Sequence, residues 1–469
     1  MKIAIILLKK GDCLVFEIKK SIRAEIESCM QAKNCTMTKL SELSGIKVGH
    51  ISEILNRRRA ITIKQLDSFS EAFNCESGWM YDLYVDECIS EKKMSKPRLV
   101  PYLIRCAEIG RYDCIELAVS RLLEVPKNIV VIFLVAEQLF EKNLLKESVF
   151  FYEIVVSNIK NSYADISVMS RYRIFRASQL QNSSDIWEDV IQFYPYRNRL
   201  PENNQLDALL HLANVCFMLE KWKYIEQCAD ELRELATLVY KNQLVKLEPL
   251  ETERHLVVYY GQGFLAKSVA LQMQGLYEEA KTYVKGYSDL SWFQYLDDNG
   301  KKEVEKFHMW SKANFYVFEL LTGNKNVLAD YVDFLENHSS EISAGLLTIM
   351  ESAIKYDFSI DHILEKLSIH ISCFNDYTDS VNIGRHYHFR YCKTIYDLKK
   401  GCIESALEEI LYCIHLADKL NHQRKFKQCV WLFWKYRVHA SEDQRKVFQN
   451  ILEGDKKDEK CIYVLSGNM

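Results

Sequence analysis

The chain has 469 residues, more than one ordinary domain needs, so two or three domains or a repeat array are expected. Its net charge of −3 excludes a polycationic protein, and any nucleic-acid binding must come from a local basic patch. With only 6 prolines and 16 glycines, it lacks the turn residues of a large β fold, and an all-α fold is predicted.

The 15 cysteines indicate reduced thiols, because they are odd in number and never form a CxxC pair. Cys106, Cys216, Cys228 and Cys413 fall on apolar helical faces, where a free cysteine behaves as a small hydrophobic residue. No apolar run is long enough to cross a bilayer. A cytoplasmic protein without a membrane partner is therefore expected.

The first residues read as an extension rather than a signal peptide, since the apolar run after Met1 is too short. Lys10-Gly11-Asp12 can be encoded by a sequence resembling a bacterial ribosome-binding site, and Val15 lies shortly downstream. We expect translation to start near Val15, with residues 1–14 an upstream extension or disordered. N-terminal sequencing of the native protein tests this, and Met1 or Lys2 at the terminus would contradict it.

The stretch Met37–Arg59 predicts two short amphipathic helices joined by a turn at Gly45. Thr38 or Ser41 supplies the hydroxyl that a helix start favours. The side chains expected to face the core are Leu40, Leu43, Val48, Ile51, Ile54 and Leu55. The expected outer face of the second helix carries Lys47, Gly49, His50, Ser52, Glu53 and Asn56.

This pattern resembles the helix-turn-helix of the Xre/Cro-like DNA-binding family. Arg57-Arg58-Arg59 and the apolar residues from Ile61 to Phe73 extend the resemblance, which covers residues 17–84. In that family the second helix lies in the major groove, so Lys47, His50 and Ser52 are expected at base edges and Asn56 and the arginines at phosphates. The predicted DNA-contacting residues are Thr38, Lys47, His50, Ser52, Asn56, Arg57, Arg58 and Arg59. The alternative is a helical hairpin packed in a core.

The chain divides by composition into five segments. The segments are an extension at 1–14, a DNA-binding domain at 15–85, a polar linker at 86–101, a repeat domain at 102–450 and a polar tail at 451–469. Within the DNA-binding domain, a first helix is expected from Phe16 to Lys33.

Beyond Pro101 a weak repeat resembles the tetratricopeptide pattern: a small or turn residue, an aromatic two later and a small residue three after that. Gly275, Tyr277 and Ala280 match all three positions. The six expected turn positions are Gly110, Asn143, Glu220, Gly275, Gly323 and Gly401. They predict a right-handed tetratricopeptide-like superhelix, with a generic helical bundle as the alternative.

Catalytic motifs are missing from the sequence: it has no Walker A loop, HExxH, GxSxG or dinucleotide fingerprint. His386 and His388 form an HxH pair, but side chains two apart on a helix point in different directions. We therefore expect no enzyme activity, no cofactor and no metal site.

The combination of an Xre-like domain with tetratricopeptide-like repeats resembles the peptide-responsive quorum-sensing receptors of Gram-positive bacteria, of the Rgg, NprR and PlcR type, with the phage arbitrium receptors as relatives. The resemblance implies a cytoplasmic, usually homodimeric transcription factor that binds a DNA operator. Its repeats would bind a short signalling peptide in a concave groove and thereby alter operator binding.

An extended peptide needs side chains that both donate and accept hydrogen bonds, and basic side chains for its carboxylate. Alignment on the turns projects six first-helix positions into the groove: Asp207, Asn214, Gln262, Gln272, His388 and Tyr391. Separately, Arg171, Arg173 and Arg176, along the segment RYRIFRAS, could hold the peptide carboxylate. Alternatively, the amides make interhelix hydrogen bonds and the arginines form a solvated face. The repeats could also serve only dimerisation of a repressor, or sequester a protein partner.

Overall fold

The computed structural model divides into two compact units, residues 1–208 and 209–469, and each is described by itself. Residues 1–14 and all but the first three of 451–469 lie outside the described part, so the predictions made for them stay predictions. The structure describes residues 21–90, 93–162, 164–181, 185–246, 251–294, 296–376, 380–420 and 422–453.

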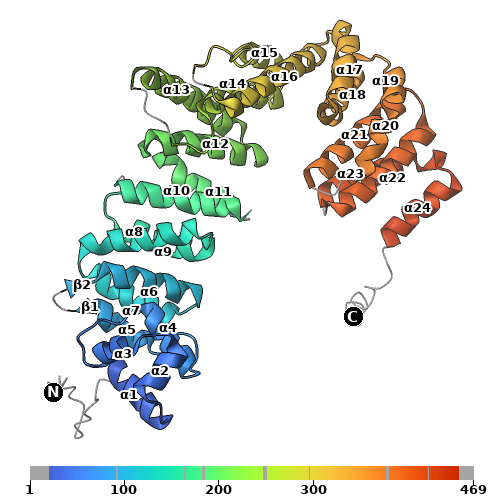
Figure 1. The fold of residues 1–469 in the computed structure, drawn as a ribbon. Helices are drawn as coiled ribbons and strands as arrows, with labels where there is room; N and C mark the ends of the chain where they lie inside the picture. The colour runs from blue at the N-terminus through green and yellow to red at the C-terminus, as the bar shows by residue number, and fades with distance from the viewer. Residues whose placement is uncertain are drawn as a thin grey trace. The chain divides into compact units, whose positions relative to one another are not determined.

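Helices α1–α12 begin in the first unit, in which successive helices stack in layers (Figure 1), and the unit boundary falls inside α12. They are α1 (Ile22–Ala32), α2 (Met37–Ser44), α3 (Val48–Leu55), α4 (Ile63–Ala72), α5 (Tyr81–Cys88), α6 (Lys96–Glu108), α7 (Tyr112–Leu123), α8 (Ile129–Glu141), α9 (Leu145–Asn158), α10 (Asp165–Leu180), α11 (Ile186–Phe193) and α12 (Glu202–Met218).

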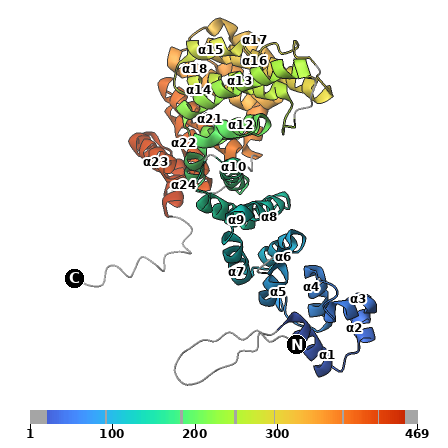
Figure 2. The same cartoon turned by 90° about the vertical axis from the view of Figure 1, so that its left-hand side faces the viewer.

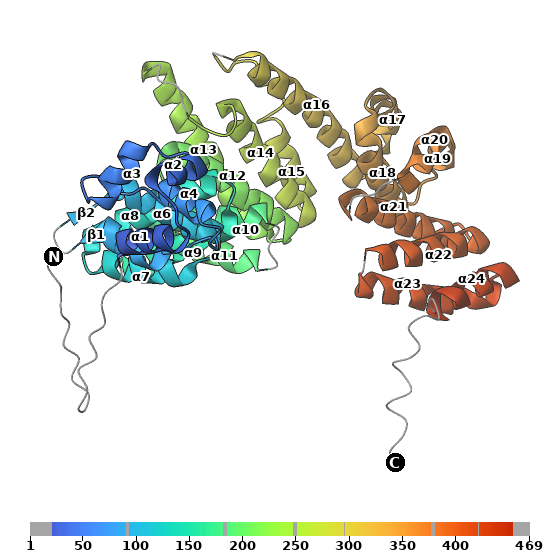
Figure 3. The ribbon, with the colours of Figure 1, turned by 60° about the horizontal axis from the view of Figure 1, so that its bottom comes forward.

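Helices α13–α24 belong to the second unit, in which α22 packs against α21 on one side and against α23 and α24 on the other (Figure 3). They are α13 (Trp222–Lys246), α14 (Leu256–Met273), α15 (Tyr277–Val284), α16 (Asp298–Leu321), α17 (Leu328–Asn337), α18 (Ile342–Tyr356), α19 (Asp361–Lys366), α20 (Ser368–Ser372), α21 (Ser380–Lys399), α22 (Ile403–Lys419), α23 (Gln423–Tyr436) and α24 (Glu442–Glu453).

The all-α prediction is confirmed. In the described residues the only strands are β1 (Ile89–Ser90) and β2 (Lys93–Met94), which pair antiparallel as a two-residue ribbon. Single 3₁₀ turns lie at Pro126–Asn128, Tyr194–Arg199, Lys325–Val327, Ser339–Glu341, Cys373–Asp376 and Arg437–His439. None of the cysteines in the described ranges forms a disulfide. None of the helices described combines the length and the apolar character of a membrane span.

The six predicted repeat turns all adopt the same local structure. Each turn residue has a positive φ, between 55° and 98°. The next backbone N–H donates to the carbonyl five residues earlier, at 2.8–3.0 Å, which is the Schellman end of a helix. Each turn therefore ends one helix and lets the next helix fold back against it. The tetratricopeptide identity of the pairs and their right-handed superhelix stay predictions.

Residues 86–101 do not form the predicted linker. They contain the end of α5, the β1–β2 ribbon and the start of α6, and Leu99 and Val100 are buried. One hydrophobic core extends without interruption from Ile22 in α1 to Val155 in α9. The polar composition of this segment predicted a linker. The prediction was wrong because the apolar residues in the segment are spaced at helical intervals and pack against α5 and α7.

Helices α5 and α6 lie beside α4 (Figure 2), and two tyrosine hydroxyls form hydrogen bonds in this region. The Tyr84 hydroxyl donates to the Ile61 carbonyl at 2.9 Å, and that of Tyr102 donates to the Tyr81 carbonyl at 2.7 Å. The Tyr102 ring lies 5.7 Å from the Tyr81 ring and 5.2 Å from the Tyr84 ring. The N-terminal helices therefore share one hydrophobic core with the helices up to α9.

The Tyr102→Phe variant is expected to lose about 1 kcal/mol of unfolding free energy, the typical net value of one intramolecular hydrogen bond. Because the core is shared, we expect α5 and α6 to lose hydrogen-exchange protection together. The exposed Tyr112→Phe variant is the control. Loss of protection confined to α6 would contradict the single core.

Candidate nucleic-acid interface

The first helix of the candidate DNA-binding hairpin, α2, is capped by Thr36. Its hydroxyl accepts a hydrogen bond from the Lys39 backbone N–H at 3.2 Å. The predicted caps, Thr38 and Ser41, are therefore wrong, because both lie inside α2. Thr38 is exposed in the first turn, and its predicted DNA contact stays a prediction.

The turn between α2 and α3 depends on Gly45, as predicted. Gly45 has φ 70°, and its N–H donates to the Ser41 carbonyl at 2.9 Å. A side chain would meet no atom there within 4 Å, so the requirement for glycine comes from the backbone conformation and not from crowding.

Packing of the hairpin follows the prediction at its centre and departs from it at the turn. Leu40, Ile51 and Ile54 are fully buried, whereas Leu43 is 52% exposed and Val48 is 40% exposed. Ile46, in the turn between α2 and α3, is buried instead. Its side chain therefore fills the core at this end of the two helices. Leu55 is half-buried.

The outer face of α3 is polar and accessible. Lys47, Gly49, Glu53 and Asn56 are exposed, while His50 is half-buried. Ser52 is also half-buried, and its hydroxyl accepts a hydrogen bond from the Asn56 amide at 3.3 Å. The same amide donates to the Ser52 carbonyl at 2.9 Å, so Asn56 closes the end of α3.

The arginine segment after α3 is folded back onto the helix. Arg57 has φ 59°, and the backbone N–H groups of Arg58 and Arg59 donate to the Glu53 carbonyl at 2.8 and 3.1 Å. The Arg59 guanidinium also lies 3.5 Å from the Glu53 carboxylate. Arg57 and Arg58 are exposed and form no ion pair with any described residue. Their two positive charges are available to a polyanion.

Arg23 of α1 holds α3 in place, a role that the sequence reading missed. Its Nε donates to the Ile54 carbonyl at 2.8 Å, near the C-terminal end of α3. Its guanidinium also pairs with Glu87 of α5, with Nη2 3.2 Å from Oε2. A cation there satisfies a terminal carbonyl and interacts favourably with the helix dipole.

The first-unit peptide candidates differ in their environments. Arg173 of α10 pairs with both carboxylate oxygens of Glu137, at 3.0 and 3.1 Å, and so ties α10 to α8. Arg176 donates to Gln179 within the same helix, and Asp207 is buried. The Arg171 guanidinium lies 4.7 Å from the Tyr196 ring, and its buried Nε has no hydrogen-bond partner among the described residues.

In the second unit, Asn214 of α12 is exposed, and Gln262 and Gln272 of α14 are half-buried. No hydrogen bond from these three amide side chains to another described residue is present, so the interhelix bonds considered as an alternative are not made there. Tyr391 accepts a hydrogen bond from Gln428 at 2.8 Å, whereas His388 is exposed. No hydrogen bond or ion pair among the described residues joins any two of these five candidates.

The HxH histidines occupy different environments. His386 is buried, accepts a hydrogen bond from Arg390 Nε at 3.0 Å, and lies near the Phe374 and Tyr412 rings. Burial lowers the pKa of His386 to about 4. His386 is therefore a neutral core residue, and its neighbour His388 points elsewhere.

Comparison with known proteins identifies one segment. The profile of a family described as Helix-turn-helix matches residues 26–80. The match begins within α1 and ends at the residue before α5, so it includes the whole α2–α3 hairpin. No curated protein matches the chain. Residues 26–80 are a helix-turn-helix domain, the DNA-binding module of a transcription regulator.

Proposed function

We propose that this protein regulates transcription by placing α3 in the major groove of an operator, and that a short peptide bound by its helical repeats controls this contact. The observation that carries the DNA part is the pair of exposed arginines, Arg57 and Arg58, at the end of a helix with a polar outer face. Arginines without an ion-pair partner can neutralise phosphates without first breaking a bond inside the protein.

The dimensions of α3 suit this role. An α-helix is about 10–12 Å across with its side chains, which fits the roughly 12 Å width of the major groove, and the 8 residues of α3 extend about 12 Å along the helix axis. Lys47 directly precedes α3, and His50 lies in its first turn. The N-terminal part of the second helix reads base edges in this type of motif. Ser52 lies on the same helix, and we assign Asn56, Arg57 and Arg58 to phosphate contacts.

Selection of bound fragments from a random DNA library by the full-length protein tests the DNA part. One enriched sequence, bound with an affinity that falls steeply with salt, is the expected result. Binding that is equally weak to every fragment would contradict an operator.

The peptide part is supported by side-chain amides that have no hydrogen-bond partner in the part of the chain that the structure describes. Gln262 lies between Gly261 and Gly263, which pack against Phe307 of α16 and Arg233 of α13. The two glycines make the contacts with the neighbouring helices, so the Gln262 amide is available to a ligand. Asn214 interrupts an apolar helix in the same way. Both side chains donate and accept, as the backbone of an extended peptide requires.

Titration calorimetry with a library of short synthetic peptides, followed by operator-binding assays at saturating peptide, tests this part. The expected result is a peptide that binds, changes operator affinity, and binds more weakly to Asn214→Ala or Gln262→Ala. A peptide can change operator affinity only if it prefers one state of the protein. Unchanged operator affinity at saturation would refute the switch while leaving DNA binding intact.

A homodimer is proposed because such motifs bind two half-sites about 34 Å apart, or a multiple of that distance. Its support is an apolar groove of about 660 Å³ between α23 and α24, lined by residues including Phe433, Trp434, Val438 and Leu452. Trp434 is 57% exposed and Val438 is 68% exposed. Arg437 also lines the groove, and an exposed tryptophan and an arginine in one apolar patch are typical of interfaces.

The Trp434→Ala variant is expected to raise the dimer dissociation constant roughly 30-fold or more, since central aromatic residues contribute about 2 kcal/mol or more to binding. Sedimentation equilibrium of the full-length protein measures this effect. Val130→Ala, which also removes an exposed apolar side chain but lies on α8, is the control. Equal dissociation constants for both variants would exclude this surface.

A further inference from the structure

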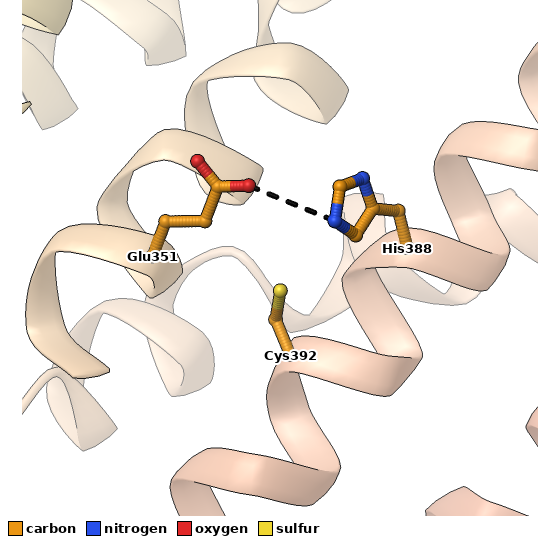
Figure 4. Close-up of side chains that lie close together, drawn as sticks. All are labelled: Glu351, His388 and Cys392. Carbon is orange, nitrogen blue, oxygen red and sulfur yellow. Dashed lines mark ion pairs between the residues drawn. The ribbon is translucent and has the colours of Figure 1, made fainter. Parts of the chain in front are cut away.

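Three potential metal ligands from two packed helices of the second unit meet in one place. His388 and Cys392 are one turn apart on α21, so they share a face of that helix. Glu351 comes from α18, which packs against α21. One ligand atom from each residue lies within 4.8 Å of the other two. Figure 4 shows the three side chains directed into the same space.

The spacing of these atoms approaches that of a metal site. The His388 Nε2 lies 3.7 Å from the Glu351 Oε1. Ligands about 2.0–2.3 Å from a tetrahedral zinc ion are about 3.4–3.7 Å from one another. Small side-chain rotations therefore suffice for all three atoms to reach one ion. A direct hydrogen bond does not explain the arrangement, because 3.7 Å is too long for one.

We propose that Glu351, His388 and Cys392 bind a divalent zinc-like cation that clips α18 to α21. A thiolate, an imidazole and a carboxylate are a ligand set that zinc accepts, whereas magnesium and calcium prefer oxygen ligands alone. Three protein ligands leave a fourth position for water or an external ligand.

The environment of each group agrees with this role. Cys392 is buried, while the His388 and Glu351 side chains are 54% and 40% exposed, so a cation can reach the site from solvent. A cysteine binds zinc as the thiolate, so binding must release the thiol proton of Cys392 to water.

The nearby cation of Lys425 opposes binding of a second cation. Its effect is offset by two negative ligands, the Glu351 carboxylate and the Cys392 thiolate. The proposal does not depend on peptide or DNA binding, and its test uses neither.

The test is a titration of chelator-treated full-length protein with Co²⁺, followed by Zn²⁺. We expect a thiolate-to-cobalt absorption band that saturates at one equivalent and disappears as Zn²⁺ displaces Co²⁺. Cys392→Ser should abolish the band, and His388→Ala should weaken binding by more than the about 10–100-fold that loss of an outer-shell partner costs. Glu351→Gln should also weaken it.

Cys402→Ser and His362→Ala are the controls, because both residues are exposed and lie outside the cluster. They should leave the band and the affinity unchanged. His388 is exposed, so its variant is expected to fold, and circular dichroism checks this. A band that survives in Cys392→Ser, no band in the wild type, or equal affinities for His388→Ala and His362→Ala would overturn the proposal.

Discussion

Removing both unpaired arginines, in the double variant Arg57→Asn and Arg58→Ala, is expected to lower operator affinity by roughly 30-fold at physiological salt. Each phosphate contact contributes about 0.9 to the slope of log affinity against log salt, so losing two contacts removes about 1.8 of that slope. Asparagine is chosen at position 57 because φ is 59° there, a conformation that asparagine tolerates better than most residues.

The loss should be nearly the same for every operator sequence, because phosphates carry no base identity. Fluorescence anisotropy of labelled operator DNA at several salt concentrations measures affinity and slope together. The control is the double variant Lys301→Ala and Lys302→Ala, which removes two exposed charges from α16.

The control should bind DNA like the wild type if a local patch is responsible. An equal loss in both double variants would indicate only an effect of net charge. A variant that prefers different bases would instead place Arg57 or Arg58 at a base edge.

The Gly261→Val variant is expected to lower the unfolding free energy of the second unit by more than about 3 kcal/mol. A Cβ at Gly261 would stand 2.5–2.7 Å from three atoms of the Phe307 ring. That ring is fully buried and lies 6.2 Å from Tyr287 and 5.5 Å from Trp310. It has little room to move away, so the helices themselves must separate.

Gly384→Ala in α21 is the matched control, because a Cβ there meets no atom within 4 Å. Alanine in an open helical position is expected to gain up to about 1 kcal/mol over glycine. Thermal melting by circular dichroism compares the two variants, and hydrogen exchange locates any loss in α14 and α16. Equal melting temperatures for the Gly261→Val and Gly384→Ala variants would contradict the close packing of α14 on Phe307.

The turns were predictable from sequence because their cause is local. Gly275 and Gly401 can adopt positive φ without a penalty, and their positions mark where a helix must end. Asn143 and Glu220 were found at equivalent positions by the same pattern, although their residue types are less favourable. The Gly45 turn belongs to the same class.

Helix starts and linkers were harder to predict. Thr36, Thr38 and Ser41 all carry hydroxyls, so the sequence offers three possible caps. Thr36 is the cap because α2 begins at the next residue, Met37, in the folded protein. Residues 86–101 have the composition of a linker, yet they pack because α7 and α8 supply apolar surface for α6. Composition alone cannot reveal a surface supplied by another segment.

The metal-ligand cluster was missed for the same reason. His388 and Cys392 lie at helical spacing, which the sequence displays, but Glu351 lies on a different helix. The HxH pair is visible in the sequence because its members are two residues apart, although one is buried and the other exposed. A site assembled from two helices becomes visible only when those helices are packed together.

The sequence by itself determined the all-α class, the helix-turn-helix and the six repeat turns, since periodicity and backbone conformational preference act within a few residues. Tertiary structure alone decided which polar groups are available. Arg173 is bound to Glu137 and Arg59 lies against Glu53, while Arg57 and Arg58 have no ion-pair partner among the described residues. The reason is physical: a charge or an amide is free for a ligand only if no neighbour, often distant in sequence, already satisfies it.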